Sequence, residues 1–292
     1  MATAIPICFS CRGLHPHTHG VKVRGSCRLG TLTFHTLYHF KGGRVNPTVL
    51  RTNATAVGRF LSILTYARDA DDALNGKRIL DCGAGGPVPP LAVFAEQGLE
   101  AHGIDISETQ LEKARAYCSK KGLEIEFKHA DMRELPYPDE FFDFVYEHFS
   151  ICHLNPEDTA KTLAEMWRVL KPEGIAFFGV ISTDCWPLSS YGKERNPGEY
   201  WMVENGEERF HAVYTDAQSD ALVADWELEM KQKVVHILRE QGEAQTEDQW
   251  RALHAEAIDN CSLDEWMSRY PNRANAFTYV HTYYIISKPE DA

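Results

Sequence analysis

The sequence predicts an α/β protein with a doubly wound, mostly parallel sheet. Strand-like and helix-like segments alternate from residue 76 to residue 181, a glycine-rich turn follows the first strand, and acidic residues follow the next strands. Alternation of this kind places helices on both faces of a parallel sheet. Ligands of such sheets bind beyond the carboxyl ends of the strands, so these turns are the candidate site.

The first half of the alternation begins with a helix. Pro47 opens a stretch whose apolar residues mostly share one face; they are Val49, Leu50, Val57, Phe60, Leu61 and Leu64. RILDC (78–82) is a short buried strand, and PLAVFAEQG (90–98) is a short helix that ends at Gly98. HGIDI (102–106) is the second strand.

The second half adds two helices and three strands. Ser107-x-x-Gln110 forms a capping box for a helix that runs to the Lys-Lys-Gly at 120–122. EIEFKHAD (124–131) and FDFVYEHF (142–149) are the third and fourth strands. Asn155 caps a helix that begins with Pro156. KPEG (171–174) ends that helix, and IAFFGVI (175–181) is the fifth strand.

The composition limits the kinds of molecule that this protein is expected to bind. The 68 residues before Asp69 hold nine of the 30 Lys and Arg residues and no acid, so the remainder carries 42 acidic against 21 basic residues. An acidic body lacks the basic footprint that nucleic-acid binding requires. No stretch has the ~18 apolar residues of a membrane span. A neutral or cationic small molecule is the expected partner, with neither nucleic acid nor membrane.

The cysteines and the N-terminus suggest a cytoplasmic protein. Eight cysteines are scattered along 292 residues, a chain too long to need a disulfide framework, and no apolar signal-peptide core is present. Cys8-x2-Cys11 and nearby histidines resemble metal ligands, but a second pair at zinc-site spacing is missing. We expect no metal, and interpret residues 1–45 as a poorly ordered basic tail or a leader.

The glycine turn reads Asp81-x-Gly83-x-Gly85-Gly86. Glycines let a ligand approach the backbone closely. The dinucleotide pattern G-x-G-x-x-G fails, because its third glycine falls at Val88. Asp81 is unfavourable beside a pyrophosphate and tolerable beside a cation. The prolines at 87, 89 and 90 delay the next helix, which we expect to begin near Pro90.

Two acidic residues follow the next strands. Asp105 ends the second strand, where a carboxylate can accept hydrogen bonds from both ribose hydroxyls; its alternative role is to support the following helix. Asp131 and Met132 end the third strand, where the acid can accept from an exocyclic amine while the methionine covers an aromatic ring. The alternative for Asp131 is a solvated loop residue.

Four motifs in register, within residues 76–181, resemble the class I S-adenosylmethionine (SAM)-dependent methyltransferases, in particular the small-molecule type 11 group. They are ILDCGAGG, HGIDIS, HADMRELPYPDEFFDFVYEHFSICHL and EMWRVLKPEG. The resemblance implies a seven-stranded sheet whose last strand is antiparallel, supplied by YYIISKP (283–289). It also implies that SAM is the cofactor and is bound by Asp81, Gly83, Ala84, Gly85, Asp105, Ile106, Gln110, Asp131, Met132 and Glu147.

The implied activity is methyl transfer to an O, N or C nucleophile of a small molecule. A general base is needed only when that nucleophile arrives protonated. His148 is the candidate base, with a packing role as the alternative, and His153 matches a histidine common in the family. A NAD-dependent oxidoreductase and a SAM-binding pseudoenzyme are the competing hypotheses. The sequence does not define the oligomeric state.

The domain organisation follows from the same resemblance. Residues 46–292 are the methyltransferase domain, and residues 182–276 form an inserted substrate lid rich in aromatic and acidic side chains. Such side chains can cage a cationic amine or enclose a flat phenol. Alternatively, the aromatic residues are the core of the lid itself.

Overall fold

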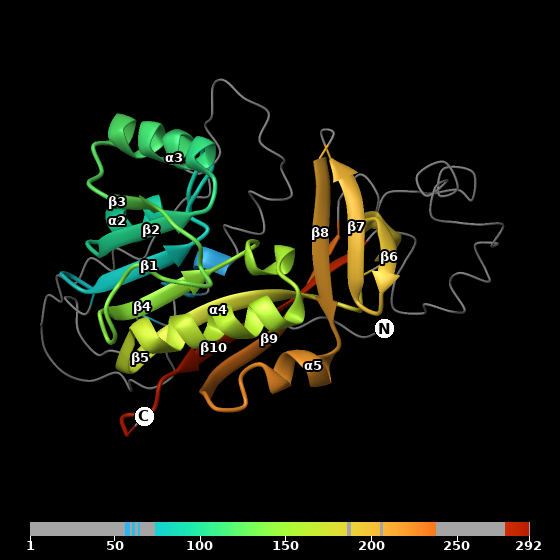
Figure 1. Ribbon diagram of the computed structural model, residues 1–292. Helices are drawn as coiled ribbons and strands as arrows, with labels where there is room; N and C mark the ends of the chain where they lie inside the picture. Colours follow the sequence, from blue (N-terminus) through green and yellow to red (C-terminus); the bar gives the residue numbers. More distant parts are fainter. Residues whose placement is uncertain are drawn as a thin grey trace, which may run out of the picture. The chain divides into compact units, whose positions relative to one another are not determined.

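The computed structural model describes residues 74–185, 188–204, 207–237 and 278–291, together with 56–58, 60, 61 and 64. These residues belong to a compact unit, residues 44–292. The unit is built on a sheet in the order β3-β2-β1-β4-β5-β10-β9 (Figure 1). The strands are β1 (Arg78–Cys82), β2 (Glu100–Asp105), β3 (Glu126–His129), β4 (Phe142–Glu147), β5 (Leu170–Ser182), β9 (Glu227–Ile237) and β10 (Thr278–Ser287).

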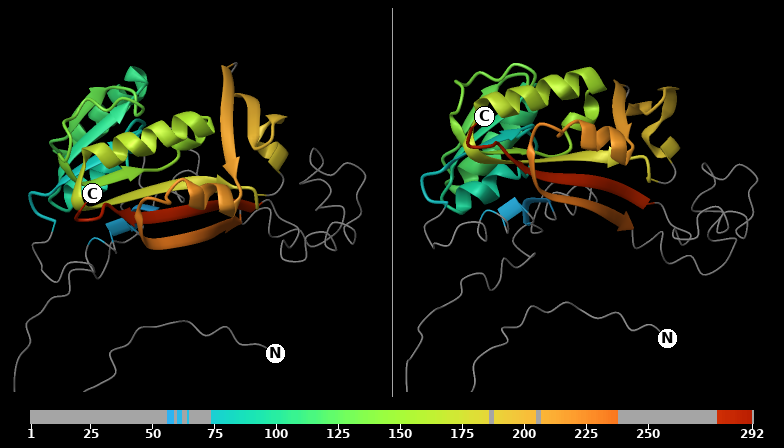
Figure 2. Two further views of the ribbon diagram at one scale, coloured as in Figure 1. Left: turned by 60° about the horizontal axis from the view of Figure 1, so that its bottom comes forward. Right: turned by 90° about the horizontal axis from the view of Figure 1, so that it is seen from below.

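The directions of these strands confirm the predicted fold class. Strands β1 to β5 pair in parallel, whereas β10 runs antiparallel to β5 and to β9. Figure 2 shows β10 and β9 lying side by side beyond β5. The motif YYIISKP supplies the carboxyl half of β10, as the resemblance implied.

Helices cover both faces of the sheet, because neighbouring residues of each buried strand point to opposite sides. On one face α4 (Pro156–Val169) contributes Leu163, Met166 and Val169 to a core that also contains Leu80 and Phe178. On the other face the rings of Phe94, Phe144, Tyr146 and Phe177 surround Phe60, with centroids 5.7 to 6.4 Å from it.

The predicted helix ends are largely confirmed. Helix α2 (Leu91–Glu96) begins directly after Pro90, and Gly98 follows it with a φ of 90°. Helix α3 (Glu108–Lys121) ends at Gly122, which is left-handed. At the start of α4 the Asn155 side chain accepts from the backbone N–H of Asp158, 2.9 Å away. These residues relieve the unpaired backbone groups at the helix ends.

The capping box predicted at Ser107 is wrong. Ser107 occupies the N-cap position of α3, but its side chain makes no capping hydrogen bond. Its backbone N–H donates to Asp105 Oδ1 at 2.8 Å. In a capping box this N–H would donate to the Gln110 side chain, so Asp105 takes the place of Gln110. Gln110 Oε1 instead accepts from Lys113 Nζ at 3.2 Å.

The boundary between α4 and β5 also differs from the prediction. The helix ends at Val169 and β5 starts at Leu170, so the KPEG segment lies in the irregular first part of the strand. Glu173 there has a φ of 59°. The KPEG segment joins the strand because its backbone pairs with the residue that follows β10. Glu173 N–H donates to the Lys288 carbonyl, and Lys288 N–H donates to the Gly174 carbonyl.

A second, antiparallel sheet extends from the carboxyl end of β5 (Figure 1). It consists of β6 (Lys193–Asn196), β7 (Glu199–Glu204) and β8 (Glu207–Tyr214). The last two residues of β5, Ile181 and Ser182, pair in parallel with Val213 and Tyr214 of β8. Thr183 N–H then donates to the Tyr214 carbonyl at 2.9 Å, so the chain enters and leaves this sheet at adjacent points.

The segment 182–276, which the sequence analysis assigned to a lid, therefore has two parts in the described structure. Helix α5 (Asp216–Ala221) leads from β8 into β9, and β9 belongs to the main sheet rather than to an appended structure. Only β6 to β8 lie outside the main sheet. Residues 238–277, like the N-terminal Cys and His residues and Val49 and Leu50, lie outside the described residues.

Within the part of the chain that the structure describes, no helix is long and apolar enough to cross a membrane. The four cysteines in that part, Cys82, Cys118, Cys152 and Cys185, are buried free thiols. The described residues also hold no group of three His, Cys, Asp or Glu side chains that could bind a metal ion.

Candidate functional site

A cavity of about 580 Å³ opens where the turns after β1, β2, β3 and β4 meet. This is the carboxyl edge of the sheet, where ligands of such folds bind. Eight of the predicted site residues line it: Gly83, Gly85, Asp105, Ile106, Gln110, Asp131, Met132 and His148. Asp81, Ala84 and Glu147 are not among the lining residues.

The glycine turn has no room for larger side chains. Gly83 has a φ of 102°, and a Cβ there would lie 1.9 Å from Ser150 Oγ. A Cβ on Gly85 would lie 2.4 Å from Asp105 Oδ2. The N–H groups of Gly83 and Ala84 both donate to the Ile104 carbonyl at 2.8 Å, which ties the turn to β2. The turn therefore forms a rigid wall of bare backbone beside the cavity.

Asp105 is held between this turn and α3. Its Oδ2 accepts from Gly85 N–H at 3.0 Å, and its Oδ1 accepts from Ser107 N–H at 2.8 Å. A carboxylate offers about four acceptor positions. Each oxygen of Asp105 therefore keeps capacity for a ligand hydroxyl.

Asp81 and Glu147 are buried behind the turn and do not line the cavity, and their role in cofactor binding stays a prediction. They are 2% and 0% exposed. Glu147 Oε1 accepts from the N–H groups of Ser150 and Ile151, both at 2.7 Å, and so shapes the turn after β4. Among the described residues, Asp81 Oδ2 and Glu147 Oε2 have no hydrogen-bond partner.

Burial makes both of these acids hard to ionise. It raises the pKa of Glu147 to about 7, against the stabilising effect of the backbone N–H groups. Burial also raises the pKa of Asp81 well above its usual range, and the nearby Glu147 and Asp105 carboxylates raise it further. A cationic ligand above the turn would favour the ionised forms of the pair.

Asp131 is fully engaged by Arg133, a residue that the sequence analysis did not identify. Asp131 Oδ1 accepts from Arg133 N–H at 2.9 Å and from Nε at 3.0 Å. Its Oδ2 accepts from Nε at 3.1 Å and from Nη2 at 2.6 Å. Arg133 Nη1 donates to Asp158 Oδ2 at 2.8 Å. The hydrogen bonds from Arg133 lower the pKa of Asp131.

The two candidate histidines have different surroundings. His148 is buried, and its Nε2 lies 3.2 Å from the Tyr283 hydroxyl. Burial, followed by His281 and His236, lowers its pKa well below the usual range. His153 lies in the short helix η1 (Ile151–His153), and its Nδ1 lies 2.8 Å from the Phe210 carbonyl oxygen. A carbonyl only accepts, so Nδ1 carries the proton and Nε2 of the neutral ring keeps its lone pair.

A groove of about 640 Å³ adjoins the cavity on the side of β7 and β8. Arg133, His153 and Leu154 line both spaces. Trp201 and Phe210 form an aromatic pair in the groove, with centroids 5.1 Å apart. Three acids, Glu157, Asp158 and Glu199, complete its charged lining. Arg209 of β8, also missed by the sequence analysis, reaches the cavity itself.

The described aromatic residues of segment 182–276 lie in different surroundings. Trp201 and Phe210 line the groove, whereas Tyr191 and Tyr200 are buried in a core of their own with Val213 and Val280. Trp226 packs edge-on against Trp167 of α4, with centroids 4.6 Å apart.

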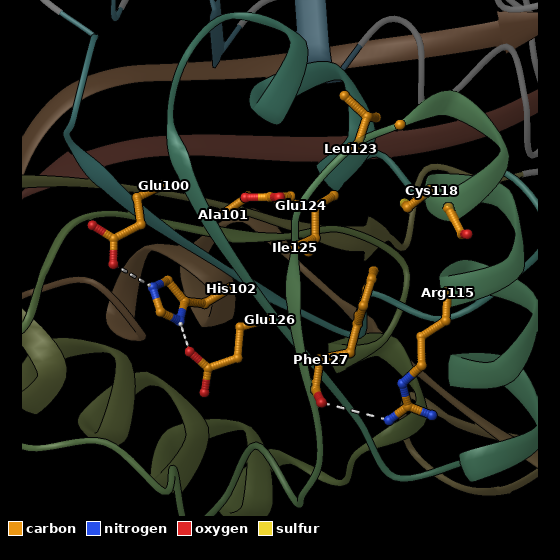
Figure 3. A pocket seen from close by; sticks show the side chains of 12 residues that line it. Glu100, Ala101, His102, Arg115, Cys118, Leu123, Glu124, Ile125, Glu126 and Phe127 are labelled. Carbon is orange, nitrogen blue, oxygen red and sulfur yellow. Dashed lines mark hydrogen bonds and ion pairs between the residues drawn. The ribbon is translucent and has the colours of Figure 1, made fainter.

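A third space, about 800 Å³, lies at the opposite end of β2, beside β3 and α3 (Figure 3). There the His102 ring lies between two carboxylates, with Nε2 3.2 Å from Glu100 and Nδ1 3.1 Å from Glu126. None of the predicted site residues lines it. Eight of the predicted site residues therefore line the cavity at the carboxyl edge, and none of them lines this third space.

Comparisons with known proteins find relatives of part of the chain. The methyltransferase domain family of the type 11 group matches residues 80–178. The 27-O-demethylrifamycin SV methyltransferase of Amycolatopsis mediterranei is 38% identical over 101 residues, 34% of this chain and 36% of that protein. A sterol 24-C-methyltransferase of Gibberella zeae is 37% identical over 109 residues, 36% of this chain and 27% of that protein.

The chain thus spans about a third of the length of these relatives. Among solved structures, a SAM-dependent methyltransferase from Methanosarcina mazei covers 74% of this chain and 93% of its own, with a TM-score of 0.54 and 19% identity. That likeness supports the fold. Over residues 80–178 the chain thus matches the methyltransferase domain family of the type 11 group.

Proposed function

We propose that this protein transfers a methyl group from SAM to a nucleophilic atom of a small-molecule acceptor. The observation that carries the proposal is the continuity of two spaces. A cavity with a glycine wall and two loop carboxylates shares His153 with an aromatic groove. The first space suits a nucleoside and the second suits an acceptor.

The residues at the cavity fit SAM. The bare backbone at Gly83 and Gly85 allows close approach, and Asp105 keeps acceptor capacity for ribose hydroxyls. Asp81 and Glu147 lie buried behind the turn, and a bound ammonium or sulfonium would favour their ionised forms, which in turn attract the cation. Ile106, 67% exposed beside the cavity, and Met132 can cover an adenine ring. SAM bound here would supply a methyl group on a cationic sulfur.

His153 is the better candidate for a general base. Its Nδ1–H is fixed on the Phe210 carbonyl, so the ring is oriented and Nε2 is the basic atom. It lines the groove as well as the cavity, so an acceptor hydroxyl or ammonium entering by the groove can reach it. His148, the base proposed from the sequence, is instead a buried neutral wall residue whose low pKa makes it a weak base.

The residues of the chain would then have two roles: some hold the cofactor and the acceptor, and one deprotonates the acceptor. The glycine turn and Asp105 hold the nucleoside, and Phe149 and His148 form part of the cavity wall. Trp201 and Phe210 orient the acceptor, and His153 Nε2 takes the proton that the nucleophile loses. Strands β7 and β8 form one side of the acceptor groove, which refines the proposed lid.

The proposal is tested with purified protein in two steps. Calorimetry with S-adenosylhomocysteine and with NAD separates the cofactor classes, and tight NAD binding without S-adenosylhomocysteine binding contradicts the proposal. Transfer of a radiolabelled methyl group from SAM to fractionated metabolite extracts then identifies the acceptor. Binding without transfer to any fraction would favour the pseudoenzyme alternative.

Variants of the two histidines test the assignment of the base. For an acceptor with a protonated nucleophile, His153→Gln should lower kcat by ~100-fold or more. His148→Gln should lower kcat far less. If His148→Gln shows the large loss of kcat and His153→Gln does not, the assignment of the base is reversed.

A further inference from the structure

Arg133 occupies the boundary between the cofactor cavity and the acceptor groove. It lines both spaces, and it bonds a carboxylate on each side: Asp131 of the cavity and Asp158 of the groove. One guanidinium is therefore shared between two acids that belong to different binding spaces. This arrangement is the starting point of an inference that rests on the proposed function.

Arg133 takes up most of the acceptor capacity of Asp131. Three of its N–H groups make four contacts with the two oxygens, because the single Nε–H is shared between Oδ1 and Oδ2, and a carboxylate has roughly four acceptor positions. The Asp131 side chain is about one-third exposed, so a ligand donor can reach it. An adenine amine therefore shares Asp131 with Arg133, and it binds best when one of the side-chain bonds from Arg133 is released.

The groove offers Arg133 a second partner when that happens. Its Nη1 already donates to Asp158 Oδ2, and the Asp158 side chain is only 18% exposed. Asp158 is fixed at the start of α4, because its backbone N–H bonds the Asn155 side chain. A small rotation of the guanidinium toward Asp158 keeps its charge paired, so release from Asp131 does not leave an isolated cation.

We propose that Arg133 is a specificity and coupling residue: it competes with the adenine amine for Asp131, and cofactor binding shifts it toward Asp158 in the acceptor groove. Two consequences follow. The competition weakens the preference of the protein for a purine that carries the 6-amine. The shift makes the groove less negative when the cofactor is bound, so cofactor and acceptor sites are linked through one side chain.

The test measures purine preference by calorimetry on the full-length protein. The ligands are S-adenosylhomocysteine and its analogue that lacks the 6-amino group, and the readout is the ratio of their Kd values. In the wild type we expect a ratio of about 3 or less, because one charged hydrogen bond is exchanged for another. In Arg133→Leu the amine meets an unopposed carboxylate, and the ratio should rise to about 10 or more.

A second variant must move the ratio in the opposite direction. Asp158→Asn removes the charge that receives Arg133 and keeps the backbone cap of α4. Arg133 then holds Asp131 more tightly, so binding of S-adenosylhomocysteine should weaken a few-fold while the analogue is little affected. Arg115→Leu is the matched control, because Arg115 is an exposed arginine paired with Glu108 on α3. It should leave both constants unchanged.

Opposite shifts of the ratio in Arg133→Leu and Asp158→Asn support the proposal, because general damage to the site would move both in one direction. Equal ratios in the wild type and both variants overturn it. Failure of the wild type to bind S-adenosylhomocysteine contradicts the proposed function instead. Circular dichroism and thermal unfolding of each variant confirm that the comparison is made between folded proteins.

Discussion

Replacing Glu147 with glutamine should make the protein more stable at high pH. Glu147 is 0% exposed, and its ordinary pKa of 4.5 is raised to about 7 in the folded state. Glutamine has nearly the same shape and keeps an oxygen for the backbone N–H groups of Ser150 and Ile151. It removes only the charge that burial penalises.

The magnitude follows from the difference between the two pKa values. One pKa unit corresponds to about 1.4 kcal/mol, so ionisation of Glu147 at high pH should lower the free energy of unfolding of the wild type by about 3 kcal/mol. Between pH 4.5 and pH 7 the folded state holds a proton that the unfolded state has released, so stability falls as the pH rises through this window. Above pH 7 the loss is complete, and below pH 4.5 it is absent.

Urea unfolding followed by tryptophan fluorescence, at pH 5 to 8.5, measures the effect. Glu147→Gln should be close to the wild type near pH 5 and about 3 kcal/mol more stable at pH 8.5. Glu165→Gln provides a control of opposite sign, because Arg168 lowers the pKa of Glu165. The stabilising effect of Glu165 is already complete above about pH 5, so that variant should be less stable than the wild type by nearly the same amount across the whole range. A constant difference between Glu147→Gln and the wild type across the whole range would refute the reasoning.

Three other substitutions test the site and the fold. Asp105→Asn should raise the Kd for S-adenosylhomocysteine more than about tenfold, since it weakens hydrogen bonds to a charged acceptor; unchanged affinity in calorimetry would contradict the ribose assignment. Gly83→Ala should destabilise by about 1–3 kcal/mol, because its Cβ meets Ser150 and its φ is positive; wild-type stability in urea would show that the turn relaxes freely. Asn155→Ala removes the side-chain oxygen that accepts from Asp158 N–H and should lower the free energy of unfolding by about 1 kcal/mol. A thermal midpoint equal to that of the wild type would contradict this role of the cap.

Local sequence signals predicted the main sheet well. The strands around Leu80, Ile104 and Val145 are short apolar runs, and each is followed by a turn with strong sequence markers. Asn155 and Gly122 mark helix ends by themselves, because their effect depends only on neighbouring backbone. The acids at the strand ends could be placed near a ligand for the same reason, since parallel strands end at one edge.

The missed features depend on contacts between distant residues. Ser107 has the sequence of a capping box, but Asp105 takes its N–H. Arg133 was missed because it bonds Asp158, which lies 25 residues away in the sequence. Glu147 was placed correctly along its strand, yet only the packed structure shows that its side chain turns under the loop toward Ser150. Polar strands such as β9 lack the apolar run that identified the central strands.

The way the chain leaves and rejoins β5 makes strands β6 to β8 a replaceable module. The excursion starts after Ser182 and returns at Tyr214, and a single backbone hydrogen bond from Thr183 closes its base. The cofactor turns lie outside this loop in the sequence, and Arg209 is the residue of the excursion that lines the cofactor cavity. Exchanging residues 183–213 with Arg209 retained would therefore change the groove wall and leave the turns of the nucleoside site in place. For engineering, the same two junctions are the natural crossover points for chimeras.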